Sequence, residues 1–401
     1  MIARHGRQRR STVWGGILKV FGASVAVLAL SAVTVAAVAV GQLQANIDSV
    51  ALVGETDGPP PELGSFEGGF NVLLVGSDEC EYSYCPGRQG VRNDVTILLH
   101  VSQDQKNIVA VSIPRDLIVP IPSCPRADGK GNYSAMSAMP INNSMSYGGL
   151  PCTVLTVEQL TGLKIPFAGV ITFKGVVAMS NAVGGVTVCT NGPVVDRRAD
   201  GLNLPRAGEY TLKGWDALGF LRTRHGVGDG SDLGRISNQQ VFMSALVRKV
   251  QDEGTLSDPA ALYRIATVAT QSMTLSNSLK NANTMISMAR VLHGMDLSRV
   301  LFVQYPTFYG TGANVNRVVP DSTRAEALFA KIRADEPFTL AEDSVGVGAV
   351  KNPNAPTATP DATPTPDATA PTDTAAPDPA PEVLDGIEGQ SAGDYTCSNA
   401  N

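Results

Sequence analysis

The sequence lacks the short motifs that mark several common enzyme classes. It contains no GxSxG nucleophile elbow, no Walker A phosphate loop, no HExxH zinc pair and no recognisable Ser/His/Asp arrangement. It also has no CxxC pair or Cys/His cluster that would indicate zinc. A basic excess is missing too, because the formal net charge is −6, which argues against nucleic acid as a partner. Any active site must therefore be built from other polar residues.

The N-terminus combines basic residues with one long uncharged run. Arginines are frequent in residues 1–10, and no charged residue occurs from Val20 to Val40. This run is long enough to cross a bilayer as a helix, and basic residues remain on the cytoplasmic side. We therefore predict a single-pass cell-membrane protein, with a secretory signal cleaved near AVA at 37–39 as the alternative. The predicted segments are a cytoplasmic tail at 1–16, a transmembrane helix at 17–41 and an extracytoplasmic stalk at 42–65.

All six cysteines follow this membrane segment. An even number of cysteines outside the cytoplasm predicts disulfides, although six cysteines allow 15 pairings and sequence alone does not select one. Free buried thiols are the alternative. Proximity, and a loop-rich stretch between two of the cysteines, favour one pairing. That pairing is Cys80–Cys85, Cys124–Cys152 and Cys189–Cys397.

Strand and helix patterns alternate through residues 66–340. Apolar, β-branched runs predict strands at 70–77, 94–102, 107–114, 167–173, 184–190 and 299–307. Helical spacing predicts helices at 151–162, 173–182, 213–224, 231–254, 257–270 and 277–293. This alternation predicts an α/β fold, a mixed α+β layered domain whose central sheet is mostly antiparallel or mixed and is flanked by helices.

The C-terminal part has a different composition. Residues 341–384 are rich in Pro, Thr and Ala with little to bury, which predicts an extended, disordered linker. A short segment at 385–401 follows and contains Cys397. If that cysteine is bonded, the segment folds back onto the domain.

Two aspartates flank neighbouring strand patterns. Asp78 follows the strand at 70–77, and Asp94 precedes the next strand. If these strands pair antiparallel, both carboxylates lie at the same end of the sheet. Two carboxylates with water suit Mg²⁺, which prefers oxygen ligands. Ordinary turn formation is the competing explanation, and spacing alone favours it.

The stretch RTRHGVGDGSDLGRISNQQ, which begins at Arg222, gathers arginines and amides between glycines. Arg222 and Arg224 are two residues apart, so an extended chain would point them the same way. On the helix that follows, Asp232, Arg235 and Gln239 share one face at i, i+3 and i+7. Arginine forks and helix N-termini both suit phosphate. The stretch predicts an anion site, with solvated salt bridges as the alternative.

Other polar residues are explained by structure when each is considered alone. Arg115 and Asp116 follow a strand that ends at Pro114, and a structural ion pair accounts for them. His100 lies within a strand pattern and is expected at the core or edge of the sheet. His225 lies near the arginines, but a structural role is again favoured.

Eight stretches between about 70 and 250 carry a combined likeness. They are NVLLVGSD, RNDVTILLHV, VSIPRDL, INNSMSYGG, VEQLTGLKI, VGGVTV, LKGWDALGFLRTRHG and DLGRISNQQ. In content and order these stretches resemble the LytR-CpsA-Psr family, with weaker likeness to about residue 337. Members of that family are Mg²⁺-dependent phosphotransferases on the outer face of the membrane. They move a glycopolymer from a polyprenyl-pyrophosphate carrier to peptidoglycan.

The resemblance implies roles for the polar residues. It implies that Asp78 and Asp94 bind Mg²⁺, with Mn²⁺ as a substitute, and that Asp232 supports the site. The implied catalytic residues are Arg115, Asp116, Arg222 and Arg224. The residues implied to hold the pyrophosphate are Arg92, Arg115, Arg222, Arg224, Arg235, Gln239 and Gln240.

Two positions depart from the family pattern. Asn238 stands where the family often has arginine, which removes one cation from the expected site. His225 lies near a position where the family often has an aromatic residue. The apolar stretch at 167–186 could line a groove for the lipid, but a place in the core is the favoured expectation.

The expected partners are a polyprenyl-pyrophosphate-linked glycan, a peptidoglycan acceptor and the membrane. Composition suggests an actinobacterial source, so the polymer could be arabinogalactan or another wall glycan. A polyprenyl-pyrophosphate hydrolase would use the same site with water as acceptor. A non-catalytic wall-binding or regulatory membrane protein is a further alternative, but the short cytoplasmic tail cannot hold a helix-turn-helix DNA reader.

Overall fold

The computed structural model describes Gly41 and residues 47–55, 68–79, 91–252, 258–292, 295–355 and 381–401. The expected cytoplasmic tail, nearly all of the expected membrane helix, Cys80 and Cys85 lie outside these residues. Within the described ranges, no helix has both the length and the apolar character needed to span a bilayer. Residues Ile47–Asn401 form one compact unit.

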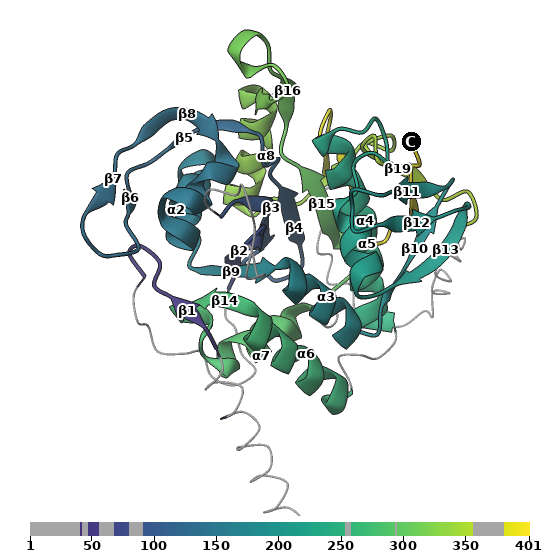
Figure 1. Cartoon of the computed structure of the whole chain (residues 1–401), viewed down its shortest axis with the longest axis horizontal. Helices are drawn as coiled ribbons and strands as arrows, with labels where there is room; N and C mark the ends of the chain where they lie inside the picture. Colours follow the sequence, from purple (N-terminus) through teal and green to yellow (C-terminus); the bar gives the residue numbers. More distant parts are fainter. Residues whose placement is uncertain are drawn as a thin grey trace, which may run out of the picture. The chain divides into compact units, whose positions relative to one another are not determined.

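An eight-stranded sheet forms the centre of this unit (Figure 1). Its strands, in spatial order, are β1 (Ser49–Val50), β14 (Met273–Ser276), β9 (Phe167–Thr172), β2 (Phe70–Ser77), β3 (Asn93–Val101), β4 (Ile108–Ser112), β15 (Val300–Gln304) and β21 (Gly389–Ser391). Strand β2 is antiparallel to β3 and parallel to β9, and β4 is parallel to β15. The sheet is therefore mixed, which confirms the predicted fold class.

Helices cover both faces of this sheet, as the alternation of side chains along β2 requires. Leu73 and Val75 enter one core, which contains residues of α2 and α8. Val72 and Leu74 face the other core, to which α5 and α7 contribute. The helices are α2 (Ser144–Thr161), α3 (Phe173–Ala182), α4 (Trp215–Arg222), α5 (Asp232–Asp252), α6 (Pro259–Ser272), α7 (Ala282–Leu292) and α8 (Ser322–Ala334).

A second sheet of four strands packs beside α5 and includes the C-terminal segment. Its order is β13 (Gly208–Leu212), β10 (Val186–Thr190), β22 (Thr396–Ser398) and β19 (Ala349–Lys351). Cys189 on β10 and Cys397 on β22 are register partners and form a disulfide. Cys124 and Cys152 form another. Both bonds confirm the predicted pairing, and Cys397 does tie the C-terminal segment to the domain.

Short two-stranded ribbons complete the unit. They are β5 (Ile118–Ile121) with β8 (Met136–Pro140), β6 (Cys124–Pro125) with β7 (Asn132–Tyr133), β11 (Val194–Asp196) with β12 (Leu202–Leu204), β16 (Thr307–Tyr309) with β17 (Val318–Pro320), and β18 (Phe338–Leu340) with β20 (Glu382–Leu384).

Candidate active site

The end of α4, the loop that follows it and the start of α5 carry many of the residues that the sequence marked. Helix α4 ends at Arg222, and the chain then turns through glycines to Asp232, where α5 begins. Gly228 has φ of +54°, and a Cβ there would come within 2.9 Å of Val347 O, so glycine is required. The Gly228 amide also donates to Asn399 O at 2.8 Å. The loop is therefore fixed by the C-terminal segment.

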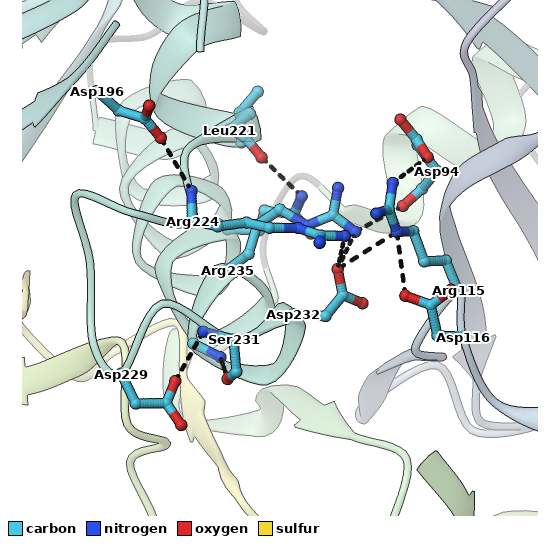
Figure 2. Close-up of polar contacts among 12 residues, drawn as sticks. Asp94, Arg115, Asp116, Asp196, Leu221, Arg224, Asp229, Ser231, Asp232 and Arg235 are labelled. Atoms are coloured by element: carbon cyan, nitrogen blue, oxygen red, sulfur yellow. Dashed lines mark hydrogen bonds and ion pairs between the residues drawn. The ribbon is translucent and has the colours of Figure 1, made fainter. Parts of the chain in front are cut away.

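Three arginines converge on the carboxylate of Asp232 (Figure 2). Arg235 Nη2 lies 2.6 Å from Asp232 Oδ1, and Arg224 Nη2 lies 2.8 Å from the same oxygen. Arg115 Nε approaches that oxygen at 3.6 Å. A single carboxylate oxygen therefore holds three guanidinium groups that come from three separate segments. We call Arg115, Arg224 and Arg235 the arginine cluster.

Asp94 joins this cluster to the central sheet. Its Oδ1 accepts from Arg115 Nη1 at 2.6 Å, and its backbone oxygen accepts from Arg235 Nη2 at 2.9 Å. Asp116 lies on the other side of Arg115, with Oδ2 3.4 Å from Nε. The start of β3, the exit from β4 and the start of α5 thus meet at one point.

Burial makes this cluster receptive to an anion. Arg235 is only 4% exposed, and burial lowers its pKa, as do the charges of Arg115 and Arg224; Asp232 acts in the opposite direction. Burial also lowers the pKa of Arg115, but Asp94, Asp232 and Asp116 outweigh this and the net shift is upward. Arg235 Nε is buried and makes no hydrogen bond to any described residue. Arg115 Nε makes none either, but it faces the carboxylates of Asp116 and Asp232. Guanidinium groups held together in this way are well suited to phosphate.

A mostly apolar cavity of about 310 Å³ reaches this cluster. Its polar lining residues include Asp94, Arg222, Arg235 and Gln239. Most of its wall is apolar, and includes Leu74, Ile97, Ile171, Phe173, Val176, Met179, Val183, Val186, Leu218, Leu221, Phe242, Met243, Leu246 and Met273. Part of 167–186 therefore lines a cavity, whereas Ala168 and Val170 are buried in the core, so the expectation of a core position holds for part of the stretch only. Packing of α3, α4 and α5 leaves a space against the sheet that the side chains do not fill.

Arg222 lies on the cavity wall rather than in the arginine cluster. Its Nη1 is 2.7 Å from Asp200 Oδ2, and its guanidinium stacks 4.3 Å from the ring centroid of Phe173. Arg224, by contrast, pairs with Asp232. The two arginines take different partners because α4 continues through Arg222 and extended backbone begins only at Thr223.

The two metal-site candidates lie at the same end of neighbouring strands, as the antiparallel pairing of β2 and β3 requires. Asp78 Oδ1 accepts from the Arg92 amide at 2.8 Å, and the Asp78 amide donates to Arg92 O at 3.0 Å. Asp94 Oδ2 has no hydrogen-bond partner among the described residues. Two carboxylates fit Mg²⁺, which usually binds one or two and keeps its water. In the described part of the chain, no three His, Cys, Asp or Glu residues gather into a metal site.

Arg92, the remaining arginine candidate, is exposed, and the hydrogen bonds described for it are those of its backbone to Asp78. Gln239 Nε2 donates to Leu221 O at 2.8 Å and lines the cavity. Gln240 is buried, and its Nε2 has no hydrogen-bond partner among the described residues.

Other marked residues have structural surroundings. Asn238 donates to Phe220 O and accepts from Ser398 Oγ, so it anchors the C-terminal segment. His225 is exposed and faces Arg198 at 3.0 Å. His100 is buried on β3, where its ring nitrogens face Asn71 and Asp335.

Sequence reasoning missed the carboxylates that orient the arginines from the β11–β12 region. Asp196 Oδ2 accepts from Thr223 Oγ1 at 2.8 Å and from the Arg224 amide at 3.4 Å. Asp200 holds Arg222. Asp196 ends β11 and Asp200 lies in the turn after it, and only the charged composition of VVDRRAD at 194–200 could have indicated them.

The chain is similar to known proteins over most of the described unit. The sequence model of the LytR_cpsA_psr family matches residues 42–333. The cell wall biosynthesis protein LcpA of Corynebacterium glutamicum is 30% identical over 293 residues, which cover 66% of this chain and 55% of that protein. The polyisoprenyl-teichoic acid–peptidoglycan teichoic acid transferase TagT of Bacillus subtilis is 30% identical over 217 residues, which cover 53% of this chain and 62% of TagT. The chain thus spans little more than half the length of these curated relatives.

A solved structure has the same fold. The LytR-Csp2A-Psr enzyme from Actinomyces oris superposes with a TM-score of 0.53 at 22% identity, covering 71% of this chain and 95% of that one.

Proposed function

The chain belongs to the LytR-CpsA-Psr family, and we propose that it transfers a glycopolymer from a polyprenyl-pyrophosphate carrier to peptidoglycan. We further propose that an N-terminal membrane anchor holds the described unit on the outer face of the membrane. The names of LcpA and TagT support this reading, because one is a cell wall biosynthesis protein and the other a teichoic acid–peptidoglycan transferase.

One observation carries the proposal: an apolar cavity ends at the buried Arg235 of the arginine cluster. Arg235 and Gln239 line the cavity, and Arg235 also belongs to the arginine cluster. A ligand that fills both places must be a long apolar chain joined to a concentrated anion. A polyprenyl pyrophosphate has this form, with the lipid in the cavity and the phosphates at Arg115, Arg224 and Arg235.

The reaction follows from this placement. A hydroxyl oxygen of the acceptor attacks the sugar-linked phosphorus and forms a new P–O bond. The bridging P–O bond breaks, and its electron pair leaves with polyprenyl phosphate. The hydroxyl proton passes to Asp116, whose carboxylate lies beside Arg115. The arginines stabilise charge on the phosphate oxygens, so catalysis is mainly positioning and electrostatics.

Asp78 and Asp94 would hold Mg²⁺ in this mechanism. The ion would supply further positive charge to the phosphate oxygens. Arg115 Nη1 donates a hydrogen bond to Asp94 Oδ1, which keeps that carboxylate oriented.

A transfer assay tests the proposal. The full chain is given a polyprenyl-pyrophosphate-linked glycan, Mg²⁺ and a peptidoglycan oligomer, and products are identified by mass spectrometry. We expect glycan joined to peptidoglycan through phosphate, lost with Arg224→Ala or EDTA and kept with Arg126→Ala, a matched exposed arginine on the β6–β7 ribbon. Glycan phosphate released without joining would identify a hydrolase instead. Binding of the donor without any turnover would favour a non-catalytic protein.

A further inference from the structure

The β16–β17 hairpin projects at the top of the view in Figure 1. It exposes large apolar side chains. Phe308 is 54% exposed, Tyr309 is 63% exposed and Val315, in the connecting turn, is 62% exposed. Aromatic side chains in solvent gain little from folding, so a group of them marks a surface that binds something. None of the three lines the apolar cavity, so the donor lipid does not account for them.

This hairpin is attached directly to the candidate active site. The Val318 amide on β17 donates to Asp116 O at 3.4 Å. Tyr309 Oη donates to Asp229 Oδ2 at 3.4 Å, and Asp229 lies in the loop that leads to Asp232. The hairpin is therefore held beside the reacting groups by two separate contacts, and Tyr309 faces them. Phe308, its neighbour on β16, projects from the opposite side of the strand.

A set of polar groups lies between the hairpin and the end of the central sheet. Gln304, the last residue of β15, is only 5% exposed, and its Nε2 donates to Glu388 Oε2 at 3.2 Å. Gln304 Oε1 and Thr307 Oγ1 are buried and have no hydrogen-bond partner among the described residues. Buried polar atoms without partners are rare in native structures, and a bound ligand is one explanation for them.

The charge of this surface is opposite to that of the arginine cluster. Burial raises the pKa of Asp229, but hydrogen bonds from Ser231 outweigh it and the net shift is downward, so Asp229 stays ionised. Desolvation raises the pKa of Glu388, and the charge of Asp229 raises it further. Carboxylates repel a second phosphate group. They accept hydrogen bonds from hydroxyl and amide groups, and aromatic rings offer a flat apolar face.

A neutral sugar chain has these complementary properties. Its hydroxyl and acetamido groups can donate to carboxylates and to Gln304 Oε1, and its C–H faces pack on aromatic rings. Phosphoryl transfer also requires that the attacking oxygen be roughly in line with the leaving oxygen. The lipid of the leaving group occupies the cavity, so the acceptor hydroxyl must approach the phosphorus from outside the cavity.

We propose that Gln304, Tyr309 and Glu388 form the binding subsite for the acceptor glycan, an inference that rests on the proposed transferase function. Glu388 lies beyond residues 42–333, so part of this subsite comes from outside the family match. The three residues bind and orient the glycan, while the chemistry remains at Arg115, Asp116, Arg224 and Arg235. We call Gln304, Tyr309 and Glu388 the acceptor subsite.

A binding experiment tests the acceptor subsite without turnover. Chitotetraose and a soluble peptidoglycan oligomer are titrated calorimetrically into the full chain in detergent, with no donor present. We expect saturable binding that weakens about tenfold in Tyr309→Ala. Tyr263→Ala removes a tyrosine that is 42% exposed on α6, and should bind as the wild type does. Thermal unfolding of each variant confirms that it is folded.

The outcomes separate this inference from the proposed function. No glycan binding to the wild type, or equal binding to all folded variants, overturns the subsite. Glycan binding that depends on Tyr309, in a protein that transfers nothing, supports the subsite and rejects the transferase function. Where transfer occurs, Tyr309→Ala should raise the KM for acceptor about tenfold and leave the Kd for donor lipid within about twofold. A matching loss of donor affinity overturns the assignment.

Discussion

The two sides of the site differ in charge, burial and origin. The arginine cluster is ion-paired within the protein, with one guanidinium almost completely buried, and all of it lies within the family match. The acceptor subsite combines the exposed ring of Tyr309 with the buried amide of Gln304 and the carboxylate of Glu388. Glu388 comes from a segment outside that match. Under the proposed function, this difference would separate two substrates, because one side suits a lipid anion and the other suits a neutral glycan.

The strongest way to break this comparison is to remove the buried charge. Arg235→Met should lower the transfer rate about 100-fold or more, because a donor aimed at the phosphate charge is lost. The measurement is single-turnover transfer with mass-spectrometric detection, alongside thermal unfolding. Arg235→Lys keeps the charge and should recover part of the rate. A folded Arg235→Met protein with wild-type transfer would falsify the donor role of the cluster.

The next largest effect should come from removing the disulfide that joins the C-terminal segment to β10, because this segment contacts both sides of the site. Cys189→Ser with Cys397→Ser opens a loop with a sequence separation of 208 residues. We expect a loss of about 2–5 kcal/mol in the free energy of unfolding, measured by denaturant titration. Cys124→Ser with Cys152→Ser opens a loop with a sequence separation of only 28 residues and should lower the free energy of unfolding by less. If the second pair costs more, the chain-entropy explanation fails.

A smaller effect should appear when the cavity alone is filled. Met179→Trp adds bulk to the α3 wall, so we expect kcat/KM to fall about tenfold for a donor with a long polyprenyl chain. A donor with a short chain should lose much less. Val383→Trp, at a position 51% exposed, is the control. Equal losses for long and short donors would mean that the lipid does not enter this cavity.

The smallest effect concerns pH and the acidic side. Desolvation raises the folded-state pKa of Glu388 above its ordinary value of 4.5, so the folded state binds this proton more tightly than the unfolded state does. Its contribution favours folding at acid pH and is lost as pH rises through the folded pKa. Glu388→Gln should therefore gain stability relative to the wild type between about pH 4 and 7. Thermal unfolding across that range measures it, with Glu209→Gln as the exposed control; identical pH profiles for Glu388→Gln and the wild type would contradict it.

Local patterns predicted the regular elements well. The strand at 70–77 and the helix at 173–182 have the expected bounds, because alternation and helical spacing are properties of neighbouring residues. The sequence also predicted that Asp78 and Asp94 lie at the same end of the sheet, once antiparallel pairing of the two strands was assumed. The i, i+3 relation of Asp232 and Arg235 also appears as an ion pair.

Features that depend on distant contacts were not predictable in this way. The short strands β21 and β22 carry no periodic signal, and only pairing with β15 and β10 defines them. Helix α8 was overlooked although Asp321 caps it and accepts from the Arg324 amide. The cavity could not be predicted, because a stretch of apolar residues has the same sequence pattern whether it packs in a core or lines a cavity.

The hydrogen bonds between the arginine loop and the C-terminal segment affect the order in which parts of the site form during folding. The Gly228 amide donates to Asn399 O, and the Asn401 amide donates to Gly226 O. Contacts across so many residues form slowly, because loop closure must precede them. We therefore expect the arginine loop to be set late in folding, after most of the central sheet has formed. If the chain acts as proposed, activity would appear only once the segment around Cys397 is paired with β10.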